Sequence, residues 1–193
     1  FASRTVVDAV AGLTPPARLS DLVDQLSARL RQANRMLREE ADRRGGSLMG
    51  STVAALILHG RNSVCIWAGD SRVYRLRGGE LKQLTRDHRW VEEYVAQGLM
   101  SREMADRHPL SHEITRAVGA EDSLELSIEV RDLTAADRFL LCSDGLYNEV
   151  TEPEIKQSLV VGDCQYSCDL LVDRALARGA RDNVTVRSEE RFS

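Results

Sequence analysis

The sequence contains no apolar run long enough to cross a membrane, and it has almost no lysine. A membrane-spanning helix needs about 20 consecutive apolar residues, and no stretch of these 193 residues approaches that length. Of the 26 basic residues, only Lys82 and Lys156 are lysines, and the arginines form no block. With a net charge of −4, this composition argues against a nucleic-acid-binding protein.

Ligands for soft metals are also scarce, with only four cysteines and four histidines. Cys65 and Cys142 lie in strand-like apolar runs, where a buried, reduced thiol is expected. Cys164 and Cys168 are four residues apart, which leaves a zinc site open, but no histidine lies near them in the sequence. The sequence therefore favours a reduced, intracellular protein.

Apolar spacing predicts helices at both ends of the chain. A stripe that includes Leu26, Leu30 and Leu37 predicts a helix over 20–43, with Ser20 as its N-cap. This stripe could also serve a coiled-coil partner, but it lasts barely three heptads, which favours packing in the core. Thr151 and Glu154 form a capping box for a helix that reaches about residue 160, and a second amphipathic helix follows over 165–178.

The middle of the chain is typical of strands separated by glycine-containing turns. The predicted strands are 51–59, 63–68, 72–77, 80–84, 114–117, 124–130, 138–143 and 182–186. Gly78-Gly79 marks a two-residue hairpin, and the polar segment at about 86–113 predicts a lid-like insertion with short helices. The order of elements predicts a single α+β domain over 1–193, in which two antiparallel sheets pack as a sandwich flanked by helices.

Three aspartates stand where strand-like runs break. Asp144 follows the apolar run 139–142, Asp182 precedes the run 184–186, and Asp70 lies between two predicted strands. Aspartate is a common turn residue, so each position also has a purely structural interpretation. Clustered carboxylates would repel one another unless a cation neutralised them, and Mg²⁺ or Mn²⁺ prefers such oxygen ligands. Two such ions can activate a shared water and neutralise phosphoryl oxygens.

Seven short blocks occur along the chain in a distinctive order. They are Gly50-Ser51-Thr52, Gly69-Asp70-Ser71-Arg72-Val73-Tyr74, Leu84-Thr85-Arg86-Asp87-His88, His108-Pro109, Ile114-Thr115-Arg116-Ala117-Val118-Gly119, Leu141-Cys142-Ser143-Asp144-Gly145-Leu146 and Asp182-Asn183-Val184-Thr185-Val186. Their order and spacing resemble the bacterial branch of the metal-dependent protein phosphatases, the type 2C or PPM family. The resemblance runs from about residue 2 to residue 186.

The resemblance implies hydrolysis of phosphoserine and phosphothreonine on proteins by a hydroxide that bridges two Mn²⁺ or Mg²⁺ ions. By this resemblance Asp144 and Asp182 match ligands of the binuclear centre, and Asp70 matches an acid that holds a third, weaker ion together with Asp144. The segment 86–113 matches a flap beside the active site. The implied protein is a cytoplasmic monomer that acts on phosphorylated proteins and opposes a Ser/Thr kinase.

Two motifs of the family are missing from this chain. The family begins with a strand that carries a phosphate-binding arginine, and a second strand ends in Asp-Gly-Met-Gly-Gly, whose aspartate bridges both metals. Phe1-Ala2-Ser3-Arg4 resembles the helix that follows them. We expect the native protein to carry both strands before Phe1. The alternatives are an inactive pseudophosphatase or phosphoprotein-binding module, and an interaction module built on the helix 20–43.

Several other polar residues have two interpretations. Arg72 and Arg116 have guanidinium groups that could contact phosphate, but a structural ion pair with a neighbouring acid is at least as good an interpretation. His88 and His108 flank the predicted flap, where hydrogen-bonding or solvent-facing roles are favoured over metal ligation.

Overall fold

The computed structural model describes residues 1–14 and 18–190, and its contacts divide the chain into two compact units. Unit 1 comprises Phe1–Val53, Trp67–Gly69 and His88–Ser127, and unit 2 comprises Ala54–Ile66, Asp70–Asp87 and Ile128–Ser193. The predicted α+β architecture with two antiparallel sheets is confirmed. The assignment of the whole chain to one catalytic domain stays a prediction.

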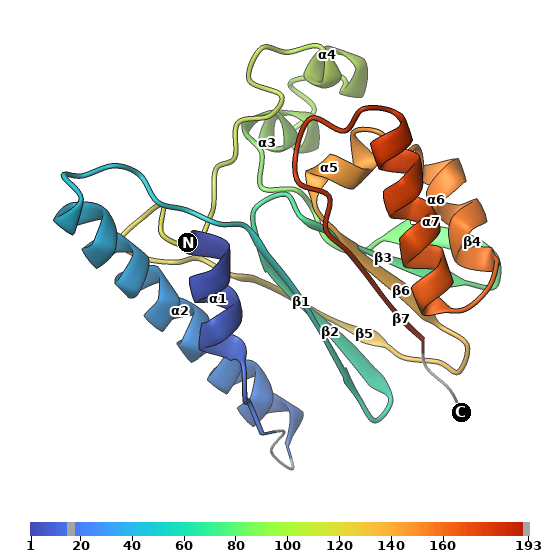
Figure 1. Cartoon of the computed structure of the whole chain (residues 1–193), viewed down its shortest axis with the longest axis horizontal. Coiled ribbons are helices and arrows are strands. Elements are labelled where there is room, and N and C mark those ends of the chain that lie inside the picture. Colours follow the sequence, from blue (N-terminus) through green and yellow to red (C-terminus); the bar gives the residue numbers. More distant parts are fainter. Residues whose placement is uncertain (15–17, 191–193) are drawn as a thin grey trace. The chain divides into compact units, whose positions relative to one another are not determined.

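Unit 1 is built around the pair of helices α1 (Ala2–Val10) and α2 (Leu19–Arg43), which pack against each other (Figure 1). The predicted stripe on α2 is buried, and Leu30 and Leu37 are fully inaccessible. The predicted N-cap was wrong, because α2 begins at Leu19, and Ser20 therefore lies inside the first turn. Its hydroxyl donates a hydrogen bond to the Asp21 carboxylate rather than capping the helix.

The predicted lid-like segment 86–113 belongs to unit 1 from His88 onward. It holds α3 (Trp90–Ala96) and α4 (Arg102–Asp106), which an ion pair between Arg102 and Glu92 connects. The Trp90 ring packs against the rings of Tyr94 and His108, with centroid separations of 4.1 and 5.2 Å. The predicted strand 114–117 was wrong. Ile114 makes only an isolated bridge to Arg89, and Thr115 donates to the His88 carbonyl, so the segment follows the lid instead of joining a sheet.

The two sheets contain seven strands among the described residues. β1 (Val53–His59), β2 (Asn62–Ala68) and β5 (Ser127–Asp132) form one sheet in the order β1-β2-β5. β3 (Arg72–Arg77), β4 (Glu80–Gln83), β6 (Arg138–Cys142) and β7 (Val186–Glu190) form the other in the order β4-β3-β6-β7. Arg77 pairs with Glu80 across Gly78-Gly79, so the predicted two-residue hairpin is confirmed.

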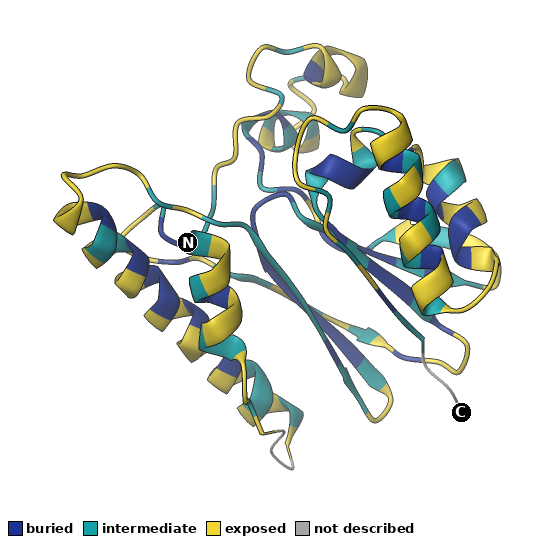
Figure 2. Ribbon diagram, in the orientation of Figure 1, coloured by how far each residue is buried: buried dark blue, intermediate teal, exposed yellow. Residues whose placement is uncertain are grey.

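The core of unit 2 lies between this second sheet and three helices, α5 (Asp144–Tyr147), α6 (Glu152–Val160) and α7 (Cys164–Ala177). Tyr74 and Leu140 contribute from the sheet, and Ile155 and Leu171 contribute from the helices. Figure 2 shows buried residues along α6 and α7 on one side of each helix only. The capping box of Thr151 and Glu154 is confirmed at the start of α6.

The last strand begins later than predicted. The sequence placed it at 182–186, but β7 begins at Val186, where it pairs with Cys142 of β6. Residues 182–185 form a loop because the Ser143 side chain takes up their backbone groups. Among residues 1–14 and 18–190, no helix is both long enough and apolar enough to cross a membrane.

Candidate metal site at the ends of two strands

Asp70 lies in the turn between β2 and β3. The turn requires a glycine before it, since Gly69 has φ of +111° and a Cβ there would lie 2.4 Å from Cγ2 of Thr52. Asp70 is only 4% exposed. The Tyr147 hydroxyl donates to the Asp70 carbonyl oxygen at 2.9 Å and approaches Oδ2 of the same residue at 3.3 Å. Tyr147 therefore contacts both the backbone and the carboxylate of Asp70.

Asp144 is the first residue of α5 and follows β6 by one residue. The residue between them, Ser143, ties this strand end to the loop that carries Asp182. Ser143 Oγ donates to the carbonyl oxygen of Asn183 at 3.0 Å and accepts from the backbone N–H of Thr185 at 3.0 Å. Its backbone N–H also donates to the Thr185 carbonyl at 3.1 Å.

Asp182 lies on the exposed loop before β7, directly beside the start of α5. A Cβ on Gly145 would lie 2.6 Å from the carbonyl oxygen of Asn183 and 3.4 Å from that of Asp182, so only glycine permits this approach. Oδ1 of Asp182 accepts a hydrogen bond of 2.6 Å from the Asn183 N–H, which fixes its side chain against the loop. The segments that carry Asp144 and Asp182, 38 positions apart in sequence, thus lie in backbone contact.

The structure connects all three predicted acids to α5. Asp144 begins this helix, Gly145 receives the Asp182 loop, and Tyr147 bonds the Asp70 turn. Within residues 1–14 and 18–190, however, no group of three histidine, cysteine, aspartate or glutamate side chains is arranged to hold a metal ion. The metal-ligand role of the three aspartates therefore stays a prediction.

The three aspartates are the type of ligand that a hard cation prefers, but they are few. Aspartate oxygens at strand ends are ligands of Mg²⁺ and Mn²⁺, which are held by one or two carboxylates and keep several waters. The described acids therefore fit a partly hydrated ion. They do not form a cage for two ions.

A half-buried arginine packs against the Tyr147 ring. Arg72, at the start of β3, donates hydrogen bonds to both carboxylate oxygens of Asp87, the shortest being 2.8 Å, and its guanidinium carbon lies 3.7 Å from the centre of the Tyr147 ring. Burial opposes the charged form of this guanidinium, but the hydrogen bonds and charge of Asp87, together with Tyr74, outweigh it and raise the pKa of Arg72.

The structural interpretation of the two arginines is thereby confirmed. Arg72 pairs with Asp87, and Arg116 pairs with Glu125 at 3.5 Å. His88 also has the predicted hydrogen-bonding role. Its Nδ1 accepts from the Gly69 N–H at 3.1 Å, and its Nε2 lies 2.9 Å from the Ser127 hydroxyl.

The two buried cysteines are not reactive thiols. Burial raises the pKa of the Cys142 thiol to about 12, so this residue beside Asp144 is protonated at neutral pH. The same cause raises the pKa of Cys65 to about 12. Both cysteines are buried, as the sequence predicted, and none of the four cysteines, all of which lie in the described part, forms a disulfide.

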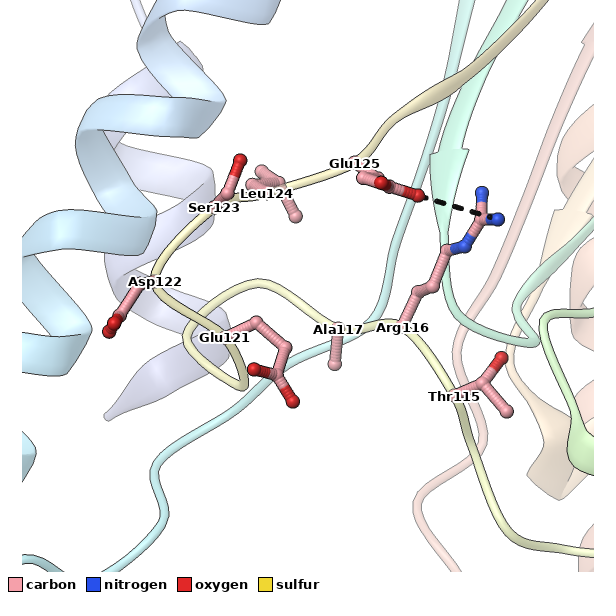
Figure 3. Close-up of a pocket in the computed structure, with 8 residues that line it drawn as sticks. All are labelled: Thr115, Arg116, Ala117, Glu121, Asp122, Ser123, Leu124 and Glu125. Carbon is pink, nitrogen blue, oxygen red and sulfur yellow. Dashed lines mark ion pairs between the residues drawn. The ribbon is translucent and has the colours of Figure 1, made fainter.

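An open pocket of about 450 Å³ lies in unit 1, whereas the three predicted acids belong to unit 2 (Figure 3). Its walls come from residues 115–117 and 121–125, and an ion pair between Arg116 and Glu125 joins two of the lining side chains. None of the three predicted acids lines this pocket.

Comparison with known proteins identifies the family to which this arrangement belongs. A family model described as protein phosphatase 2C matches residues 1–168. The chain belongs to the protein phosphatase 2C family. The resemblance inferred from the order of the short blocks is thus confirmed.

Relatives in this family include both curated sequences and solved structures. The serine/threonine protein phosphatase PstP of Mycobacterium tuberculosis is 36% identical over 189 residues, which cover 96% of this chain. This chain spans only 36% of the length of that relative. The solved structure of PppA, a regulatory component of T6SS in Pseudomonas aeruginosa, is 39% identical with a TM-score of 0.88, covering 98% of this chain and 80% of PppA.

A third comparison concerns metal. The catalytic domain of PstP has been solved in complex with two manganese ions. It is 32% identical with a TM-score of 0.87, and the match covers 100% of this chain and 81% of that domain. The fold of this chain is therefore that of a manganese-binding member of the family.

Sequence reasoning missed two residues of the site. Ser143 was part of a recognised block, but nothing in its spacing indicated that it would bond two backbone groups 40 and 42 positions away. Tyr147 had a usable signal, because a residue three positions after Asp144 on a helix lies on the same face.

Proposed function

We propose that this chain is the catalytic part of a metal-dependent protein phosphatase that hydrolyses phosphoserine and phosphothreonine on proteins with Mn²⁺ or Mg²⁺. The observation that carries the proposal is the backbone contact between the Asp144 and Asp182 segments in a protein phosphatase 2C chain. Two carboxylates brought to one place by strand ends are what binding a hard cation requires. The names of the relatives, and the manganese in the PstP domain, support the same reaction.

In this proposal the acids bind the cation and Ser143 positions them. Asp144 and Asp182 would supply carboxylate oxygens to the cation, with Asp70 as a further ligand. Ser143 would hold the first two segments at a fixed separation. When bound, divalent cations of this kind polarise water and neutralise phosphoryl oxygens. Phosphoryl transfer needs mainly this positioning and charge neutralisation, so no nucleophilic side chain is required of the protein.

Substrate, partner and location belong to the same proposal. The substrates would be phosphorylated proteins, and the opposing enzyme a Ser/Thr kinase, because the related proteins are named serine/threonine phosphatases. We place the protein in the cytoplasm as a monomer, with 1–193 acting as one catalytic domain and 86–113 as a flap at the active site. The four cysteines, none of which forms a disulfide in the described part of the chain, are consistent with that compartment.

The test is hydrolysis of a phosphothreonine peptide by the full-length protein in Mn²⁺. Asp144→Asn and Asp182→Asn should each lower kcat/KM by at least about tenfold at limiting Mn²⁺, because each removes a charged ligand. Asp173→Asn is the matched control, since Asp173 is exposed on α7 away from the strand ends. Hydrolysis that persists in excess chelator, or at the wild-type rate in Asp144→Asn, would contradict the proposal.

A second candidate is a phosphoprotein-binding module without turnover. It is favoured by the lack of a three-ligand metal cluster in residues 1–14 and 18–190. Such a module would bind a phosphothreonine peptide tightly and leave it intact at saturating Mn²⁺. Release of inorganic phosphate from the peptide would exclude it.

A further inference from the structure

The Tyr147 hydroxyl connects the α5 helix to the backbone and the side chain of Asp70, and Tyr147 lies outside the seven family blocks. Its ring is half-buried, and its hydroxyl faces the Asp70 backbone carbonyl at 2.9 Å. The distance to Asp70 Oδ2 is 3.3 Å, longer than the 2.5–2.7 Å of a strong O–H···O⁻ bond. The shorter bond of the Tyr147 hydroxyl therefore holds the backbone of the turn, and the longer one contacts the Asp70 carboxylate.

The Tyr147 ring is itself fixed by an anchored cation. The guanidinium carbon of Arg72 lies 3.7 Å from the ring centre, well within the range of about 6 Å over which a cation is attracted to an aromatic face. Arg72 cannot swing away easily, because it donates to both oxygens of Asp87 and to the Tyr74 hydroxyl at 2.9 Å. The side chain of Asp87 is 3% exposed, so this anchor is buried.

The position of Tyr147 in the chain joins two of the predicted ligands. It ends the short helix that Asp144 begins, three residues earlier, so the two side chains lie on neighbouring positions of one turn. A displacement of α5 would therefore move Asp144 and, through the Tyr147 hydroxyl, the Asp70 turn as well. Partners of this kind, which orient a ligand without touching the metal, commonly change metal affinity by about 10–100-fold when removed.

We propose that Tyr147 is a positioning residue that fixes the Asp70 carboxylate relative to Asp144, so that both acids can hold one weakly bound divalent cation. The proposal rests on the proposed function for the role of the two acids. It extends that function by naming the group that orients a ligand of the weakly bound ion. This group is the hydroxyl of Tyr147, whose ring packs against Arg72.

The decisive variant is Tyr147→Phe, which removes the hydroxyl and keeps the ring over Arg72. Binding of Mn²⁺ by the full-length protein would be titrated by electron paramagnetic resonance, so the readout does not depend on hydrolysis. We expect Tyr147→Phe to weaken the weakest Mn²⁺ site by about tenfold, and the Mn²⁺ concentration for half-maximal hydrolysis to rise by the same factor. The rate at saturating Mn²⁺ should change little.

Tyr166→Phe is the matched control, because Tyr166 is 52% exposed on α7 and the same atom is removed. Its Mn²⁺ titration should be unchanged. The double variant Tyr147→Phe with Asp70→Asn should bind no more weakly than Asp70→Asn alone, because a positioning residue has no effect once its ligand is gone.

Three results would overturn the inference. One is a Tyr147→Phe protein with wild-type Mn²⁺ affinity and lower thermal stability, which would assign the hydroxyl a structural role only. Another is additive weakening in the double variant. The third is an Asp70→Asn protein that binds Mn²⁺ as the wild type does; if Asp144→Asn still abolished hydrolysis, the proposed function would stand while this inference failed.

Discussion

Substituting alanine for Gly145 should separate the two loops on which the candidate site depends. A Cβ at this position would lie 2.6 Å from the Asn183 carbonyl oxygen and 3.1 Å from its carbon. Both atoms belong to the backbone, so the loop must move as a whole. Gly145 lies in α5 without a positive φ, so the substitution introduces no backbone strain of its own.

The expected change in the free energy of unfolding is the sum of three terms, of which two are destabilising and one is stabilising. Overpacking of this kind costs about 1–3 kcal/mol. Moving the loop also weakens the bond from Ser143 Oγ to the Asn183 carbonyl, worth about 1 kcal/mol. Alanine is favoured over glycine in a helix by up to about 1 kcal/mol, which offsets the lost bond. We therefore expect Gly145→Ala to lower the free energy of unfolding by about 1–3 kcal/mol.

Urea denaturation followed by circular dichroism would measure this change, and Mn²⁺ titration would show whether the site is affected. We expect Mn²⁺ affinity to fall, since the ligand segments move apart. Gly50→Ala is the control, because its new Cβ would meet only ordinary contacts at 3.6 and 3.7 Å. It should be neutral or slightly stabilising. A Gly145→Ala protein as stable as the wild type, with unchanged Mn²⁺ affinity, would refute the contact.

Three further substitutions test other parts of the fold. Asn34→Leu should cost about 2–4 kcal/mol in urea denaturation, because this buried amide donates to two backbone carbonyls and accepts from one N–H, and all three bonds would be lost; wild-type stability would contradict these bonds. Asp137→Asn should cost about 1–3 kcal/mol in the same assay, since it removes the buried charge that Arg77 contacts through two bonds of 2.6 Å; an unchanged midpoint would show that the pair contributes nothing. Hydrogen bonding to Arg178 lowers the pKa of Glu154 from 4.5 to about 2, so this carboxylate stabilises the fold above pH 4.5 and loses that contribution as the pH falls toward 2. Denaturation midpoints should therefore fall less between pH 6 and pH 3 in Glu154→Gln than in the wild type, and equal slopes would count against the assignment.

The sequence predicted those parts of the fold in which a local pattern decides the structure. The stripe on α2 is buried at Leu26, Leu30 and Leu37 because a 3.6-residue repeat leaves only one face apolar. The hairpin at Gly78-Gly79 followed from the turn chemistry, since both glycines have positive φ. These signals lie within a few residues of the structure they determine.

The two errors in strand placement arose where distant groups compete for the backbone. The run 182–186 has the β-branched residues of a strand, but Ser143 bonds its backbone at both Asn183 and Thr185 and keeps the first part as a loop. The run 114–117 looked equally extended, and its Thr115 N–H is taken by the His88 carbonyl. No local pattern reports a hydrogen bond to a residue that lies tens of positions away.

The candidate site was predictable as a set of acids but not as a geometry. Aspartates at strand ends suggested the ligands, and the joint order of the blocks suggested the family, which comparison confirmed. What brings Asp144 and Asp182 together is the lack of a side chain at Gly145 and one hydroxyl on Ser143. In the sequence, each of these two residues is also typical of an ordinary turn or helix cap.

The reciprocal bonds between Ser143 and Thr185 close a loop of the chain that contains α5, α6 and α7. Both Asp144 and Asp182 lie just inside the point of closure. A fluctuation that opens this clasp would release the two acids in one cooperative event, whereas opening elsewhere in the helices would leave them in place. The amide protons of Ser143 and Thr185 therefore belong to one unit of local stability. Under the proposed function, the lifetime of these bonds would limit how long the two acids could hold a cation.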